Sequence, residues 1–375
     1  MITVFEDNKA LNLEPICLTR AVFDIRFGSE TIFQRINRLS NNKVSSFYVR
    51  DSIRGITQDR YPIAEFDYNS SSNNIWLNAS VVWNSNDIEK IMYSEESIFI
   101  SDNELIGFNL SKNLSYGIEL VKEFSMLNIP KDISVSELSV KKINYLWDMI
   151  SLIKDIVIET QERFKPNKIP ENIVIDEANG PVVIADNVSI GPLTFLKGPV
   201  FLDAESKISS HSIIQNSIIG PGCKVGGEIS GTIFLGWSNK AHDGHLGDSI
   251  IGEWGNFGAG STNSNLKNNY KSVSVTVNGS LVNTNSLFIG LFIGDHSKVA
   301  IGTQFNAGTN VGVGCSVIAN AFPERYIPSF TFYNNDQIKK INFVKFLETA
   351  KVVKERRNQN LSEFEINLLK KIYEK

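Results

Sequence analysis

Long apolar runs are missing from this 375-residue sequence, and so is a large excess of either charge. No stretch approaches the roughly 18 uninterrupted apolar residues that a membrane-spanning helix needs, and Glu6 and Asp7 lie where a signal peptide would be apolar. With 37 Lys and Arg against 41 Asp and Glu, no strongly basic surface is expected, which argues against nucleic acid as the main partner. These absences predict a cytoplasmic protein without a membrane span.

Cysteine is scarce as well, because the chain holds only Cys17, Cys223 and Cys315. No two of them form a CxxC pair. An odd and scattered set of this kind argues against a disulfide scaffold and against a structural zinc site. It is typical of a protein from a reducing compartment.

Glycine is nearly absent from both ends of the chain. Of the 26 glycines, 22 lie between Gly180 and Gly314, four lie before that segment and none follows it. So sharp a change in composition indicates a domain boundary. We expect an α/β domain over residues 1–135, a helical linker over 136–170, a glycine-rich domain over 171–332 and C-terminal helices over 333–375.

Apolar residues recur at every sixth position inside the glycine-rich segment. Two registers hold this step: Ile184, Ile190, Leu196, Leu202, Ile208 and Ile214, and then Ile293, Val299, Phe305, Val311 and Val317. Such a period is neither helical nor the alternation of a simple strand. It is typical of a left-handed parallel β-helix, whose stacked coils bury one continuous apolar column. The alternative is an antiparallel sandwich with glycine turns, which would show alternation and irregular turn spacing.

The remaining segments mix strands and helices, which favours an α/β domain at the N-terminus. Strands are expected at residues 1–5, 45–49, 75–77 and 97–101, and helices at 31–39, 136–164 and 336–357. A further helix is expected to begin at Ser362, with Glu365 completing a capping box. The tail is expected to be a solvated amphipathic helix pair that packs on the end of the coil or on a neighbouring subunit.

Titratable residues interrupt the coil pattern in one place. His242 and His245, two of only four histidines, lie in segment 239–248, where the regular step breaks. Histidine removes protons near neutral pH, and sites are commonly grafted where a regular scaffold is interrupted. From spacing alone, the alternative is that both histidines are corner residues on a solvated loop.

A polar excursion follows over residues 261–271. Its residues cannot form coil core, so the segment is expected to project outward with Lys267 and Lys271 as hydrogen-bond donors. Donors of this kind are what a sugar phosphate needs. An Asn-rich loop without a binding role is the alternative, because asparagine is common throughout the chain.

The runs KAHDGHLGDSIIGEW, FGAG and NSNLKNNY resemble the acetyltransferase half of the GlmU family, the bifunctional N-acetylglucosamine-1-phosphate uridyltransferases and glucosamine-1-phosphate acetyltransferases. IGDHSK and YIPSF extend the likeness, which covers about residues 13–332 and is strongest over 236–330. The resemblance implies a nucleotidyltransferase-like α/β domain before the β-helix. It also implies acetyl-CoA as a cosubstrate, bound between neighbouring coils of a homotrimer.

Position by position, the resemblance assigns His242 as the general base of acyl transfer. It implies that the amino-sugar phosphate is bound by Asn256, Asn265 and Lys271, and Lys267 of the polar excursion is expected to bind it as well. It further implies that the arm of acetyl-CoA lies beside Ala259, Gly260 and Ala307. Two positions depart from the family, because His245 and Leu266 stand where its members carry tyrosine.

The N-terminal part departs further. Members of the family open with a glycine-rich loop whose backbone N–H groups hold phosphates, and that loop is missing here. Arg20 and Arg26 are still expected to contact phosphate. Segment 99–106 is similar to the strand end that carries a magnesium ligand, so the resemblance implies Asp102 as a ligand for Mg²⁺.

The leading hypothesis is a sugar-nucleotide pathway transferase that moves an acyl group from CoA to an amino-sugar phosphate and carries a GlmU-like sugar-1-phosphate nucleotidyltransferase domain. One alternative is nucleotidyl transfer from a nucleoside triphosphate alone, with the β-helix as a trimerising or regulatory scaffold. Another is a zinc β-helix of the γ-carbonic-anhydrase type, using His242, His245 and a third histidine at the subunit interface. The last is a non-catalytic regulator that binds a sugar nucleotide.

Overall fold

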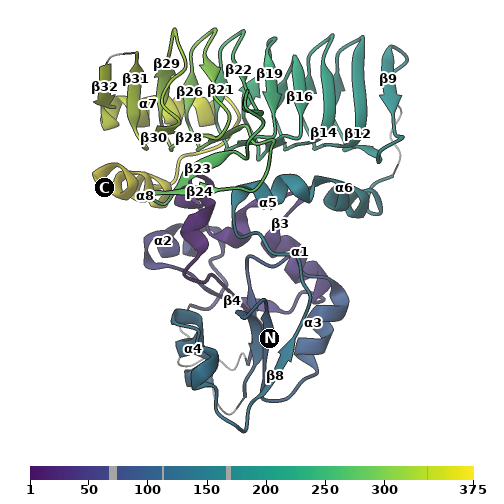
Figure 1. Ribbon diagram of the computed structural model, residues 1–375, viewed down its shortest axis with the longest axis vertical. Coiled ribbons are helices and arrows are strands. Elements are labelled where there is room, and N and C mark those ends of the chain that lie inside the picture. Colours follow the sequence, from purple (N-terminus) through teal and green to yellow (C-terminus); the bar gives the residue numbers. More distant parts are fainter. Residues whose placement is uncertain (67–73, 112–113, 166–169, 336) are drawn as a thin grey trace. The chain divides into compact units, whose positions relative to one another are not determined.

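The computed structural model describes residues 1–66, 74–111, 114–165, 170–335 and 337–375 (Figure 1). The chain forms two compact units. The N-terminal unit comprises Met1–Leu13, Arg20–Ile25 and Glu30–Asn144, and the C-terminal unit comprises Glu14–Thr19, Arg26–Ser29 and Tyr145–Lys375. Within the described ranges, no helix has the length and apolar character that crossing a membrane requires.

The N-terminal unit is built on a six-stranded mixed sheet in the order β4–β1–β5–β7–β6–β8. Its strands are β1 (Ile2–Phe5), β4 (Val44–Tyr48), β5 (Ile75–Asn78), β6 (Ser97–Ser101), β7 (Glu104–Asn109) and β8 (Ser134–Glu137). Its helices are η1 (Ala10–Leu13), η3 (Val22–Asp24), α1 (Ile32–Leu39), α2 (Asp51–Arg60), α3 (Ser85–Met92), α4 (Leu114–Lys122) and η4 (Met126–Asn128). Phe5, Trp76 and Phe108 pack together in its core. The predicted strands and the helix at 31–39 are confirmed, the latter with Thr31 as N-cap and Gln34 in a capping box.

The helix predicted over 136–164 begins ten residues later. Residues up to Glu137 form β8, which pairs in parallel with β6 at the edge of the sheet. The helical part consists of α5 (Leu146–Ser151) and α6 (Ile153–Gln161). The Asp148 carboxylate accepts a hydrogen bond from the Tyr145 N–H at 2.9 Å, and this cap explains why the helix starts where it does.

The C-terminal unit is a coil of short parallel strands, consistent with a left-handed β-helix (Figure 1). One sheet comprises β9 (Ile173–Asp176), β10 (Val182–Ile184), β12 (Thr194–Leu202), β14 (Ile213–Ile219), β16 (Glu228–Ser230), β17 (Ile233–Phe234), β19 (His245–Gly247), β20 (Ile250–Ile251), β25 (Leu291–Ile293), β28 (Thr309–Val311) and β30 (Tyr326–Ile327). A second carries β11 (Ser189–Ile190), β13 (Lys207–Ile208), β15 (Lys224–Val225), β18 (Asn239–Lys240), β21 (Asn256–Phe257), β26 (Lys298–Val299), β29 (Ser316–Ile318), β31 (Thr331–Asn334) and β32 (Gln337–Lys340). The pair β22 (Thr262–Asn263) and β27 (Gln304–Phe305) forms a separate two-stranded sheet.

The apolar column inside the coil confirms the six-residue registers. Nine of the eleven residues predicted to point inward are buried, namely Leu196, Leu202, Ile208, Ile214, Ile293, Val299, Phe305, Val311 and Val317. The other two, Ile184 and Ile190, are partly buried and pack against the same column. Parallel pairing stacks the layers directly, as in the register of Ile251 on Ile293 and of Ile293 on Val311.

One corner of the coil is aromatic. Trp237, Trp254 and His296 all have positive φ angles, of 55°, 63° and 61°, and their rings stack. The ring centroids lie 5.6 Å apart for the tryptophan pair and 6.3 Å apart for Trp254 and His296. In the neighbouring layer Gly222 leaves room for the stack, because a Cβ there would lie 2.4 Å from the Trp237 ring. We call these three stacked residues the aromatic corner.

The polar excursion is longer than predicted and begins later. Thr262 and Asn263 stay in the coil as β22, the chain leaves at Ser264, and it returns at Gly290. The excursion contains a hairpin of β23 (Ser274–Val277) and β24 (Ser280–Asn283). Buried valines on β23, and a hydrogen bond from Asn310 Nδ2 to the Thr276 carbonyl at 2.8 Å, hold the hairpin on the coil.

The C-terminal helices are α7 (Phe343–Glu355) and α8 (Glu363–Glu374). The predicted capping box of Ser362 and Glu365 is confirmed. The helix predicted from 336 starts only at Phe343, because residues 337–340 form β32, which pairs with β31. Helix α7 packs along the aromatic corner. The Phe346 ring meets the His296 ring edge-on with centroids 5.9 Å apart, and Lys354 Nζ lies 5.4 Å from the Trp254 ring centroid.

Candidate functional site

The break in the coil gathers polar side chains from three layers. β16 and β19 pair in parallel with Glu228 opposite His245, and His245 Nδ1 lies 3.4 Å from Glu228 Oε1. The other ring nitrogen, Nε2, lies over Gly247, where an added Cβ would be only 2.5 Å away. That Cβ would also be 2.7 Å from Nδ2 of Asn265. His245 and Asn265 therefore converge on the space above one glycine.

Asparagines fix the neighbouring strand end. Asn265 Nδ2 donates to Asp248 Oδ2 at 2.6 Å, and Asn263 Oδ1 accepts from the Gly247 N–H at 2.9 Å. Burial raises the pKa of Asp248, while the Asn265 hydrogen bond and the nearby His245 oppose that rise. We call His245, Gly247, Asp248 and Asn265 the acceptor cluster.

His242 lies three residues before His245 on an exposed corner. The backbone of this corner is held by Lys240, whose side chain is buried and whose Nζ donates to the carbonyl oxygens of His242 at 2.8 Å and Asp243 at 2.9 Å. A third bond reaches the Gly226 carbonyl in the preceding layer at 3.2 Å. Burial lowers the pKa of Lys240 to about 8. Lys240 thus anchors the corner that carries His242.

A cavity of about 350 Å³ adjoins the acceptor cluster through the chain that links Asn265 to Lys267. Lys267 and Arg325 contribute two cationic side chains to its lining, and Ala307 and Phe322 contribute apolar surface. We call this space the excursion cavity. Arg325 was not predicted, although its place in the proline-containing stretch 321–328, directly after the coil repeats, marks it as a basic residue outside the regular pattern.

Other predicted binding residues lie outside this lining. Asn256 accepts a hydrogen bond from Asn239 Nδ2 at 2.9 Å, a ladder contact between stacked coils. Ala259 and Gly260 form a coil corner, where the Ala259 carbonyl accepts from Gly302 N–H at 2.8 Å. Lys271 is exposed on the excursion. Their binding roles stay predictions.

The sheet of the N-terminal unit offers a second candidate site at the ends of β1 and β5. In open α/β sheets, ligands bind where the strand order reverses, which here is between these two strands. Asp7 Oδ2 accepts from Asn78 Nδ2 at 2.9 Å across this position, and only about 10 Å³ of cavity remains there. A larger cavity of about 180 Å³ lies beside it, lined by Lys9, Glu104 and Lys122 among others.

Charged groups at these strand ends already have partners. Glu6 is buried and accepts from Arg50 Nη1 at 2.5 Å and from the Val22 N–H at 2.7 Å. Burial raises the pKa of Glu6, and the Arg50 charge opposes this. Glu104 pairs with both Lys9 and Lys142. Burial acts to raise the pKa of Glu104, but these two lysines hold it below its usual value.

The two arginines predicted to contact phosphate belong to different units, and their binding roles stay predictions. Arg20 is buried in the N-terminal unit, where its carbonyl accepts from Arg50 Nη2 at 3.0 Å. Arg26 belongs to the C-terminal unit and its Nη1 lies 3.4 Å from Asp203 and 3.0 Å from the Ser29 carbonyl. A guanidinium already paired with a carboxylate is less available to a phosphate.

Asp102 lies in the two-residue turn between β6 and β7. Both turn residues have positive φ, 52° at Asp102 and 61° at Asn103, the geometry of a type I′ hairpin turn that favours Asp and Asn. Across the described ranges, no group of three or more His, Cys, Asp or Glu gathers in a way that would hold a metal ion. The turn geometry is sufficient to explain an Asp at this position, and the role of Asp102 as a magnesium ligand stays a prediction.

Comparisons with known proteins bear on both units. Residues 2–165 match the family model of a sugar nucleotidyl transferase. The chain is 30% identical over 211 residues to the bifunctional protein GlmU of Methanocaldococcus jannaschii, a match over 51% of this chain and 47% of the relative. It is 28% identical over 143 residues to a bifunctional sugar-1-phosphate nucleotidylyltransferase/acetyltransferase of Sulfurisphaera tokodaii, over 38% of this chain and 32% of the relative.

Among solved structures, the UDP-N-acetylglucosamine acyltransferase from Campylobacter jejuni is similar at 14% identity, with a TM-score of 0.24, over 54% of this chain and 95% of that one. The chain spans less than half the length of the two curated relatives described above. The chain is thus similar to a sugar nucleotidyl transferase model over residues 2–165 and to several curated bifunctional proteins, GlmU proteins among them.

Proposed function

We propose that the C-terminal unit transfers an acetyl or other acyl group from a CoA thioester to the amine of an amino-sugar phosphate. The observation that carries this proposal is the juxtaposition at the break in the coil. His242 lies on an exposed, anchored corner three residues before His245 of the acceptor cluster, and the adjoining cavity carries two cations, Lys267 of the excursion and Arg325. The curated relatives, which include acetyltransferases by name, support the same reaction class.

In the proposed reaction the acceptor nitrogen attacks the thioester carbonyl carbon. A C–N bond forms, the C–S bond breaks, and the CoA thiolate leaves and takes up a proton. His242 accepts the proton that the amine loses, which is the task of a general base. His242 is exposed, whereas His245 Nδ1 lies 3.4 Å from Glu228 Oε1 and its Nε2 lies over Gly247.

The acceptor cluster and the excursion cavity bind different parts of the substrates. Asp248 and Asn265 present a carboxylate and an amide to the amine and hydroxyl groups of a sugar. Lys267 and Arg325 offer positive charge to the phosphates of the sugar or of CoA. Because corner residues such as His242 are exposed in one protomer, we further propose a homotrimer in which a neighbouring coil completes the acyl-CoA site.

For the N-terminal unit we propose binding of a nucleotide or sugar 1-phosphate, with nucleotidyl transfer as its activity. The match of residues 2–165 to a sugar nucleotidyl transferase model supports this. The cavity beside Lys9 and Lys122 is the best-placed pocket among the described residues of that unit. Nucleotidyl transfer alone, with the coil as a scaffold, is the competing function, and the acceptor cluster with its adjoining cavity is the observation that weighs against it.

Acyl transfer is tested by following free thiol during incubation with acetyl-CoA and a panel of amino-sugar phosphates. We expect thiol release that depends on an amino-sugar phosphate and is absent with the corresponding N-acetylated sugar. A parallel assay follows pyrophosphate from nucleoside triphosphates and sugar 1-phosphates. Thiol release with no member of the panel, together with CoA-independent pyrophosphate release, would select nucleotidyl transfer alone.

The acceptor cluster is tested by Gly247→Ala. The new methyl group would lie under 3 Å from His245 Nε2 and Asn265 Nδ2, so both must shift and the Asn265–Asp248 bond is disturbed. We expect kcat/KM for the amino-sugar phosphate to fall about 10–100-fold, because a misplacement of about 1 Å has an effect of this size. Gly255→Ala is the matched control, since its nearest neighbour would be the Ser238 hydroxyl at 3.2 Å. Equal losses in both variants would contradict the role of the cluster.

A further inference from the structure

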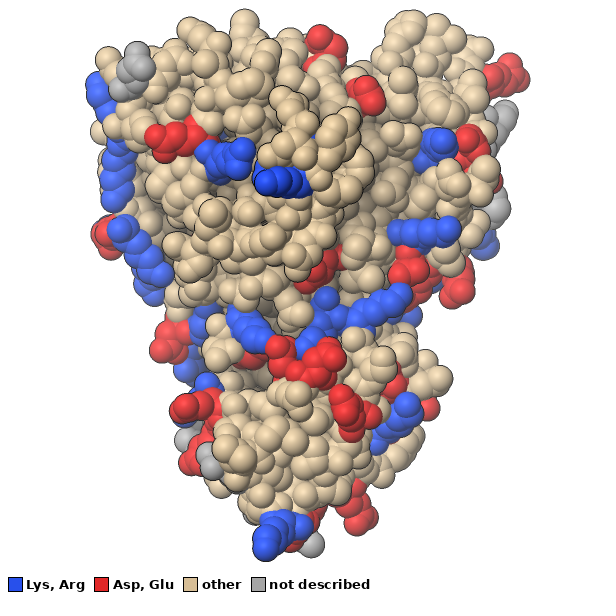
Figure 2. Space-filling view, viewed as in Figure 1, with Lys and Arg blue, Asp and Glu red and all other residues tan. Residues whose placement is uncertain are grey.

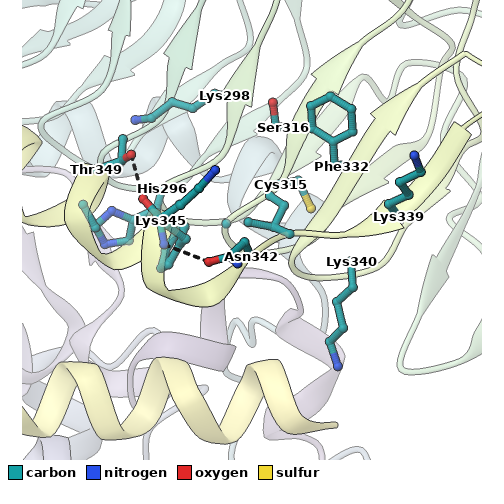
Figure 3. A pocket seen from close by; sticks show the side chains of 14 residues that line it. His296, Lys298, Cys315, Ser316, Phe332, Lys339, Lys340, Asn342, Lys345 and Thr349 are labelled. Carbon is teal, nitrogen blue, oxygen red and sulfur yellow. Dashed lines mark hydrogen bonds between the residues drawn. The ribbon is translucent and has the colours of Figure 1, made fainter.

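A cavity in the C-terminal unit lies away from the break in the coil. Its volume is about 390 Å³, and it is lined by strands of the second sheet of the coil and by the first two turns of α7 (Figure 3). We call it the lysine pocket. It shares no lining residue with the excursion cavity, so the proposed acyl transfer does not use it.

Apolar and aromatic side chains form much of the lysine pocket. Phe332 from β31 and Phe346 from α7 contribute rings, while Cys315 and Ala350 contribute smaller buried groups. Apolar lining of this kind, in a cavity of a few hundred Å³, is typical of sites for small organic molecules. The pocket therefore favours a ligand with an apolar body.

Positive charge surrounds this apolar lining. Lys298, Lys339, Lys340 and Lys345 line the pocket, and no carboxylate is found in its described lining. Figure 3 shows Lys340 directed away from the other labelled side chains, and its Nζ lies 4.5 Å from the Tyr373 ring centroid. Figure 3 also shows Lys298 and Lys345 on one side of Phe332 and Lys339 on the other, so Lys298 and Lys345 are the two labelled lysines that share one side of the pocket. Figure 2 shows Lys and Arg side chains following one another along the edge of the coil at this end.

Two features of the lysine pocket favour a bound anion. Lys298 is largely buried, its Nζ donates to the neutral Trp254 carbonyl at 2.6 Å, and burial lowers its pKa to about 8. The N-terminus of α7, a 13-residue helix, opens at the pocket through Asn342 and Lys345, and the positive end of the helix dipole lies there. An anion bound at this place gains from both.

We propose that the lysine pocket binds a small organic anion with an acyl or otherwise apolar body, its carboxylate or phosphate head held by Lys298 and Lys345. The apolar body packs on Phe332 and Phe346, and the head lies at the lysines and at the start of α7. This site is additional to the proposed acyl transfer and does not depend on it.

Calorimetric titration of the full chain with four probes tests the proposal. Octanoate and octyl phosphate carry the two head groups on one body, 1-octanol has the body without charge, and inorganic phosphate has charge without the body. We expect at least one of the two amphipathic anions to bind about tenfold or more tightly than both 1-octanol and inorganic phosphate. The tighter of the two identifies the head group. Failure of both anions to bind, or equal binding of 1-octanol, would overturn the proposal.

Variants locate the binding. Lys345→Gln is expected to weaken anion binding about tenfold or more, because a charge-assisted contact with the head group is lost. Ser316→Phe is expected to fill the cavity and abolish binding, since Ser316 lines it from β29. Lys351→Gln is the matched control, because Lys351 is an exposed lysine of the same helix that pairs with Glu355 and is not part of the lining. An equal loss in the control, or unchanged binding in both pocket variants, would refute this location.

Discussion

Replacement of His242 by asparagine is expected to lower kcat for acyl transfer about 10²–10⁴-fold, the usual contribution of a positioned general base. Asparagine is similar in size to histidine but cannot take up a proton from the amine. Because His242 is exposed and its backbone is anchored by Lys240, the fold should be unaffected. Steady-state thiol release at saturating acetyl-CoA and acceptor measures this loss.

Two further variants make the result specific. His211→Asn changes another exposed histidine at a coil corner, where φ is 59° and asparagine is well tolerated, and it should retain full activity. His245→Asn should raise KM for the acceptor more than it lowers kcat, since His245 belongs to the acceptor cluster. If instead His245→Asn abolished turnover and His242→Asn left it intact, the Glu228–His245 pair would be the base.

Phe234→Ala is expected to destabilise the coil by about 3–5 kcal/mol, as large-to-small changes at buried aromatic positions do. Phe234 is fully buried and lies in register with Ile219 on one side and Ile251 on the other. Each layer of the coil rests on its neighbours, so a cavity in one layer weakens both adjoining contacts. The midpoint of urea unfolding, followed by circular dichroism, reports the change.

Ile213→Ala is the control for this substitution. Ile213 belongs to β14 in the same coil but is 43% exposed, so its replacement should change stability by no more than about 0.5 kcal/mol. A loss in Phe234→Ala no larger than that of Ile213→Ala would contradict the view that the apolar column holds the coil together.

The coil was predictable because its period is local and repeated. Each inward residue is followed by a corner, and the same chemistry recurs often enough that both registers, from Leu196 to Ile214 and from Ile293 to Val317, are buried as predicted. The capping boxes at Thr31 and Ser362 were readable for the same reason, since both partners lie within one turn of helix.

Features formed by residues far apart in sequence were not predictable. Glu228 and His245 lie side by side because β16 and β19 stack in register. The six-residue period is interrupted here, so the spacing of the sequence does not predict which residues face each other. Arg26 was predicted to contact phosphate from its local sequence. That sequence does not reveal Asp203, 177 residues away, whose carboxylate lies beside the Arg26 side chain. The helical tail was predicted to pack on the end of the coil or on another subunit. In the structure α7 packs on the aromatic corner, a side surface that exists only once the coils are stacked.

The excursion from Ser264 to Gly290 separates the two tasks of the coil. The stacking of the coil does not depend on this segment, because β20 before it pairs directly with β25 after it, with Ile250 opposite Phe292. The segment nevertheless supplies Asn265 and Lys267 to the acceptor cluster and the excursion cavity. Insertions or deletions there can retune substrate choice without touching the framework, so an evolving lineage, or a protein engineer, can diversify specificity by exchanging this segment as a module.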